Sequence, residues 1–147
     1  MLFCEPSMQS DGGPQIHLMA FVERPAEKKS GPALLQVYIA NESPSPWGIL
    51  NDLDSINIPQ HLPHGSEPIP DTDLIHLDFG VSGSGAFIQV SPGACLKVTL
   101  VLRAEQLALL ERVKFMKAAV KFRAGRDKTG EVKTALLPAT VYVVHRH

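Results

Sequence analysis

The sequence of 147 residues has little cysteine, few aromatic residues and almost no net charge. Its two cysteines are too few for the disulfide framework that holds many small secreted domains together. The formal net charge is −1, and acidic and basic residues are interspersed, so no strong field attracts nucleic acid or anionic lipid. Apolar runs stay well below the ~20 residues that a membrane-spanning helix needs. We therefore expect no membrane span and no nucleic-acid partner.

The N-terminal stretch MLFCEPSMQSDGG lacks the basic start and the sustained apolar segment of a secretory signal. This absence favours a reducing, cytoplasmic setting, in which Cys4 and Cys95 are expected to be buried or partly buried thiols. A disulfide between them is the alternative. The glycines and proline that end this stretch predict a flexible arm over residues 1–14.

Alternating apolar residues dominate the rest of the chain and predict β-strands. The helix-forming stretch AEQLALLERV (104–113) predicts the one short helix. Twelve prolines and eleven glycines favour many turns, among them a hairpin loop at 125–130. The predicted strands cover 15–23, 33–41, 74–81, 85–90, 94–102, 117–124, 131–137 and 139–146, with a further short strand near 55–58. We expect consecutive strands to pair antiparallel, which predicts an all-β, antiparallel, immunoglobulin-like β-sandwich of seven to nine strands in a single domain, 15–147.

The segment HLPHGSEPIPDTDLIHLD (61–78) is rich in possible metal ligands, with His61, His64, Glu67 and His76. The prolines within it exclude a helix that would align these side chains, and their spacing matches no common zinc pattern. We interpret the segment as a solvated surface loop that leads into a strand, and we expect no cofactor. A metal-binding protein or metalloenzyme that uses these four residues is the alternative.

No catalytic pattern stands out elsewhere. The glycine-rich stretch 80–87 is followed by a predicted strand and not by the helix that a phosphate loop needs. No nucleophile lies at a strand-to-helix elbow. The sequence therefore predicts a protein that is not an enzyme.

Two surfaces are candidates for binding. Residues 44–73 form an unusually long irregular segment, which in a compact domain is often functional. This segment holds Trp47, the only tryptophan, which we interpret as a core residue or as an exposed anchor for a peptide. Lys121 and Arg123 share one face of a predicted strand, and Lys133 lies on the next strand, so together they form a possible basic face.

The order of three segments gives a resemblance at the level of the fold. ALLQVYIANES is followed by a long irregular segment, then by VSPGACLKVTLVL, and then by AAVKFRAGRDKTGEVKTALLP. This order resembles an immunoglobulin-like module and is similar to the appendage ("ear") domains of vesicle-coat adaptor subunits. Those domains are cytosolic β-sandwiches that bind short peptides in accessory proteins. The resemblance spans about Ala33 to Val144 and implies an adaptor-like role, without assigning binding residues.

These observations predict a non-enzymatic, cytoplasmic module that binds a partner protein or peptide, alone or within a larger assembly. Its expected contacts are Trp47, Lys121, Arg123 and Lys133. A structural subunit that self-associates through an edge strand, giving a homo-oligomer, is a further alternative.

Overall fold

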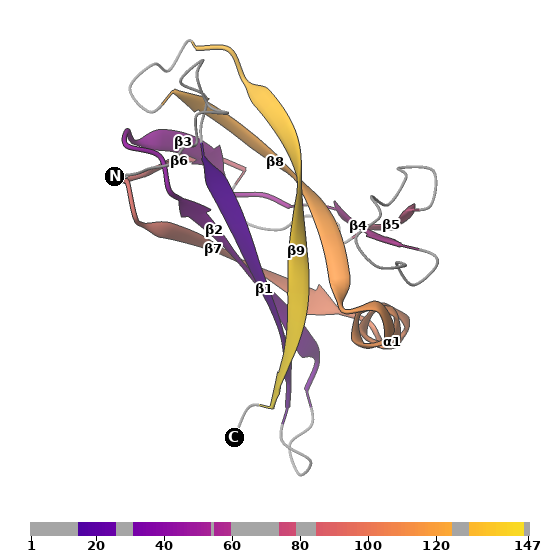
Figure 1. Ribbon diagram of the computed structural model, residues 1–147. Coiled ribbons are helices and arrows are strands. Elements are labelled where there is room, and N and C mark those ends of the chain that lie inside the picture. Colours follow the sequence, from indigo (N-terminus) through magenta and orange to yellow (C-terminus); the bar gives the residue numbers. More distant parts are fainter. Residues whose placement is uncertain are drawn as a thin grey trace, which may run out of the picture.

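The computed structural model describes residues 15–25, 31–53, 55–59, 74–78, 85–124 and 130–145, with only the backbone described at 55, 59 and 74–78. The described residues form nine strands and one helix (Figure 1). In chain order these are β1 (Ile16–Arg24), β2 (Ala33–Asn41), β3 (Trp47–Leu50), β4 (Ser55–Pro59), β5 (Leu74–Asp78), β6 (Phe87–Val90), β7 (Cys95–Leu102), α1 (Ala104–Val113), β8 (Phe115–Ala124) and β9 (Lys133–His145). The predicted arm at 1–14 and residues 125–129 of the hairpin loop predicted at 125–130 lie outside the described residues.

The strands form one mixed sheet that is nearly closed around a hydrophobic core. The strand order is β5-β4-β8-β9-β1-β2-β7, and β3 pairs with both β6 and β8. The mostly β architecture with one helix confirms that part of the prediction.

The prediction of a purely antiparallel sheet is wrong, because β1 and β9 run parallel. Their pairing begins at Ala20 opposite Val141 and ends at Arg24 opposite His145. The prediction assumed that neighbouring strands are joined by tight turns, and tight turns do impose antiparallel pairing. These two strands come from opposite ends of the chain, so no turn constrains their direction.

The core consists of the inward-facing residues of the predicted alternating strands. On β1, Leu18, Ala20 and Val22 are buried, and on β2 the core residues Leu35, Val37 and Ile39 have no exposed surface. Their period-two spacing puts each set on a single face of its strand. The inner face of each strand therefore consists of residues at alternate positions in the sequence.

β9 is longer than predicted, because it continues through Pro138 where the sequence suggested a break. Residues 133–140 pair with β8, and residues 141–145 pair with β1. Figure 1 shows β9 running between these two neighbours and beside β1 only over its second half. The long strand thus links the two parts of the sheet.

A short strand, β3, occupies part of the segment that was predicted to be irregular. Its register sets Trp47 opposite Val90 of β6 and opposite Ala124 of β8. The turn before it is fixed by Asn41, which is fully buried and whose side-chain amide donates to the carbonyl of Val90 at 2.9 Å and to that of Ser45 at 3.0 Å. The Asn41 side-chain oxygen also accepts a hydrogen bond from the N–H of Ser43 at 2.9 Å.

The predicted helix is confirmed as α1, which joins β7 to β8. The Gln106 side chain accepts a hydrogen bond from the Arg103 N–H at 2.9 Å and so caps the start of the helix. Leu110 and Val113 face the core, and Lys114 ends the helix in the left-handed conformation, with φ of 59°. In the described part of the chain, no helix has the length and apolar character to cross a membrane.

Cys95 is exposed, which corrects the prediction of a buried or partly buried thiol. It stands at the start of β7 on the same face as Lys97, whereas Val98, Leu100 and Leu102 point into the core. Cys95 and Lys97 are two residues apart in the strand, so their side chains point to the same, outer face.

Candidate binding groove

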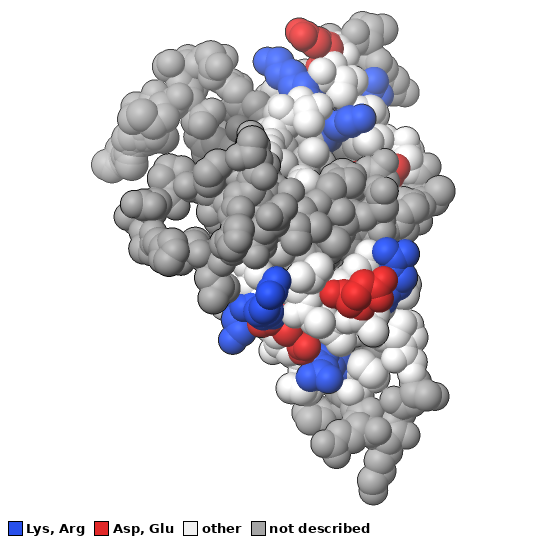
Figure 2. All heavy atoms as spheres, turned by 90° about the vertical axis from the view of Figure 1, so that its right-hand side faces the viewer, with Lys and Arg blue, Asp and Glu red and all other residues white. Residues whose placement is uncertain are grey.

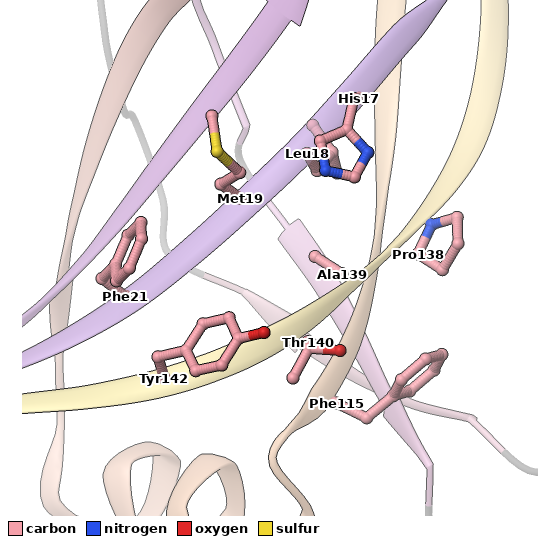
Figure 3. A pocket seen from close by; sticks show the side chains of 9 residues that line it. All are labelled: His17, Leu18, Met19, Phe21, Phe115, Pro138, Ala139, Thr140 and Tyr142. Atoms are coloured by element: carbon pink, nitrogen blue, oxygen red, sulfur yellow. The ribbon is translucent and has the colours of Figure 1, made fainter.

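β1 and β9 leave a wedge-shaped gap between them on the outer side of the sheet. They pair from Ala20 and Val141 onward, but before that point the two strands diverge (Figure 3). β1 is still paired with β2 there, and β9 with β8. Within the described residues, no strand fills the space between them.

The wedge is a groove of about 510 Å³. Leu18 and Ala139 contribute to its lining although both point toward the core and are almost fully buried. The groove therefore reaches down between the two strands. The other lining residues are His17, Met19 and Phe21 of β1, Pro138, Thr140 and Tyr142 of β9, and Phe115 of β8. Its volume is within the range of roughly 300–1,000 Å³ that is usual for ligand pockets.

An aromatic cluster closes the narrow end of the groove. The register sets Phe21 opposite Tyr142, and their ring centroids are 5.9 Å apart. The Phe21 ring also meets the ring of Tyr38 on β2 edge to face, with the centroids 5.8 Å apart. Such aromatic pairs across strands stabilise a sheet while leaving their outer surfaces available.

A second hollow of about 410 Å³ continues the groove past this cluster. It shares Met19 and Phe21 with the first and adds Glu23, Tyr38 and Val144. The two hollows form one apolar track along the outer face of β1. We call the first hollow the β1–β9 groove, and the rings of Phe21, Tyr38 and Tyr142 the aromatic cluster.

Two of the sequence-predicted binding residues have structural partners. Trp47 is half-buried, packs against the core and meets Phe122 edge to face, with the centroids 5.8 Å apart. The Arg123 guanidinium lies 4.3 Å from the centroid of the Phe87 ring, a cation–π contact. The interpretation of Trp47 as a core residue is the one that these contacts favour.

The two lysines do not share a face. Lys121 is exposed and stands opposite Thr134, whereas Lys133 is exposed and stands opposite Phe122. Because successive residues of a strand point to opposite faces, this register separates Lys133 from Lys121 and Arg123. In Figure 2, basic and acidic side chains are interspersed over the described surface around β8 and α1, with no large field of one sign.

The predicted metal ligands are not tested. His61, His64 and Glu67 lie outside the described residues, and only the backbone of His76 is described, in β5 opposite Asn57. Among the residues that the structure does describe, no group of three or more histidine, cysteine, aspartate or glutamate side chains could hold a metal ion. The metal site therefore stays a prediction.

The β1–β9 groove was not predicted from the sequence, although a signal was present. In β1 both faces carry large apolar residues, with Met19 and Phe21 alternating with the buried Leu18 and Ala20. A strand with water on one side usually carries polar residues there, so large apolar residues on both faces indicate an apolar outer surface. What the sequence did not reveal is that β9 lies beside β1.

Comparisons with known proteins add no function. No family model matches the chain, and no curated protein matches it. A structure solved as target SoR45 of the Northeast Structural Genomics Consortium is 12% identical, with a TM-score of 0.45 over 95% of this chain and 97% of that one. A protein of unknown function from Porphyromonas gingivalis W83 is 8% identical, with a TM-score of 0.30 over 86% of this chain and 46% of that one.

Proposed function

We propose that this protein is a non-enzymatic interaction module that binds a partner protein or peptide in the β1–β9 groove. The observation that carries the proposal is the groove itself, which is apolar, is lined by aromatic residues and reaches between two strands. Aromatic residues around a hollow are typical of the central contacts in protein interfaces.

The position of the binding surface differs from the one expected from the sequence. Trp47 and Arg123 are engaged with Phe122 and Phe87, whereas Tyr142 has 57% of its surface exposed. An exposed tyrosine held by a neighbouring ring provides contact area at a low cost in side-chain entropy. We therefore place the proposed contact at Tyr142 and its neighbours.

The adaptor-like, cytoplasmic setting is part of the same proposal. Its support is the sequence resemblance to immunoglobulin-like appendage modules and the exposed thiol of Cys95, which suits a reducing compartment. The parallel pairing of β1 and β9 is an addition to the antiparallel pattern on which that resemblance is based.

A displayed library of random peptides, each about 8 residues long, tests the proposal when the folded chain is the bait. We expect selected peptides to lose about tenfold or more in affinity for Tyr142→Glu, because a charge replaces the central aromatic contact. The matched control is Val101→Glu on β7, since Val101 is 59% exposed and does not line the groove. This control should bind with unchanged affinity.

Both variants are checked by thermal unfolding, because the affinity comparison holds only for folded protein. A library that yields no binder, or binders that respond equally to Tyr142→Glu and Val101→Glu, contradicts the proposal. The first result removes the interaction function, and the second places the contact elsewhere on the surface.

A further inference from the structure

The edge of β1 that faces the groove has backbone groups that no described strand pairs. Gln15 accepts a hydrogen bond from the N–H of Glu42 at 2.8 Å, and these two residues continue the β1–β2 register. In an antiparallel pair, alternate residues direct their N–H and C=O groups toward the partner. Residues 17 and 19 therefore face β2, and the backbone groups of Ile16 and Leu18 face the groove.

The opposite edge of the groove belongs to β9 and is less suited to pairing. Val141 donates its N–H to the carbonyl of Lys114 at 3.0 Å, in continuation of the β8–β9 register. By the same alternation, Ala139 faces β8, and the backbone of Pro138 and Thr140 faces the groove. Pro138 has no N–H to donate, and a proline at an edge is a common obstacle to strand addition.

The groove therefore favours an extended chain that pairs with β1. Such a chain would form backbone hydrogen bonds with Ile16 and Leu18 and would place alternate side chains against the apolar lining. An added strand has room only before Ala20 and Val141, where β1 and β9 begin to pair, so a segment of about 8 residues that starts beside Thr140 spans roughly 26 Å and extends to the start of β9. At that end the outer face carries the exposed Lys121, opposite Thr134, so a carboxylate would complement its charge.

We propose that the β1–β9 groove binds an extended, apolar segment of a partner protein as an added strand on β1, with a carboxylate at the end that lies over Lys121. This inference rests on the proposed function and specifies its ligand and binding mode. The partner segment is recognised by backbone hydrogen bonds, by apolar side chains at alternate positions and by one acidic residue.

Amide hydrogen exchange of the protein with the tightest peptide from the random library tests the strand addition. We expect the Ile16 and Leu18 amides to exchange more slowly in the complex. The amides of His17 and Met19 serve as the internal control, because they face β2 in the free protein and should change little. Protection of Ile16 that rises with protein concentration in the absence of peptide would show a second copy in the groove and overturn the proposal.

Substitutions separate the backbone contact from the side-chain contact. Ile16→Pro removes the N–H at the first position of β1, where proline is tolerated, and should weaken peptide binding about fivefold. Ile16→Val keeps the N–H and is the matched control. Lys121→Glu should weaken the same peptide, and replacing the acidic residue of the peptide by lysine should restore its affinity for that variant.

The outcomes distinguish this inference from the proposed function. Peptides that respond to Tyr142→Glu but bind Ile16→Pro and Ile16→Val equally, with unchanged amide exchange, overturn strand addition and leave the proposed function standing. Selected peptides without an acidic residue that are indifferent to Lys121→Glu overturn the charge contact. A library without any groove-dependent binder overturns both proposals.

Discussion

Aromatic side chains have two different roles in this protein, and their burial separates these roles. Trp47 and Phe122 meet edge to face next to the core, where Phe122 is buried and Trp47 half-buried. Phe21 and Tyr142 also contact each other, but Tyr142 lies on the outer face with most of its surface exposed. The first pair should determine stability and the second recognition.

Truncation of Trp47 should therefore lower stability, whereas truncation of Tyr142 should weaken binding. We expect Trp47→Ala to lower the free energy of unfolding by about 2 kcal/mol. This loss is smaller than that for a fully buried aromatic residue, because only part of the Trp47 ring is buried. Tyr142→Ala should change the free energy of unfolding by less than about 1 kcal/mol and act on peptide binding instead. Urea unfolding of the two variants measures the difference, and equal loss of stability would contradict this division.

At the scale of the element, β9 shows how a strand can contain a proline. Its residues 133–140 pair with β8, and the alternation of hydrogen bonds directs the nitrogen of Pro138 away from β8. The missing N–H is therefore on the edge that no described strand pairs before Val141. Pro138 interrupts no hydrogen bond of this ladder.

Two adjacent substitutions test this account of β9. We expect Pro138→Ala to leave the free energy of unfolding within about 1 kcal/mol of the original, because it restores no ladder hydrogen bond with β8. Ala139→Pro should lower it by about 3 kcal/mol or more, because the N–H of Ala139 faces β8 and its side chain is buried. Denaturant unfolding measures both values. A large loss in Pro138→Ala would show that the strand is organised differently.

The elements that the sequence predicted are those whose signals are local. The period-two alternation of Leu35, Val37 and Ile39 is contained in one strand, and the composition of 104–113 is contained in one helix. Which strands lie side by side, and in which direction, depends on residues far apart in the sequence. The parallel pairing of β1 with β9 therefore has no local signal. The groove depends on that pairing and therefore could not be predicted, although its apolar residues could be recognised.

At the scale of the whole molecule, the formal charges nearly cancel. The net charge is −1, and Figure 2 shows basic and acidic side chains interspersed on the surface that faces the viewer. Long-range attraction of a charged partner is weak for such a surface. The apolar track along β1 and β9 is thus a better candidate for partner selection than the basic residues on β8.

The salt dependence of peptide binding should reflect this balance. We expect the affinity of a groove-binding peptide to fall by no more than about fivefold between low and high salt, because one exposed ion pair contributes about 0.2–1 kcal/mol. Lys121→Ala should remove this dependence without changing the melting temperature. Arg123→Ala, on the same face of the strand, should keep the dependence and lower the melting temperature, since the guanidinium packs on Phe87. Calorimetric titration at several salt concentrations provides the measurement, and a steep decrease in affinity that disappears in Arg123→Ala would instead locate binding on the basic residues of β8.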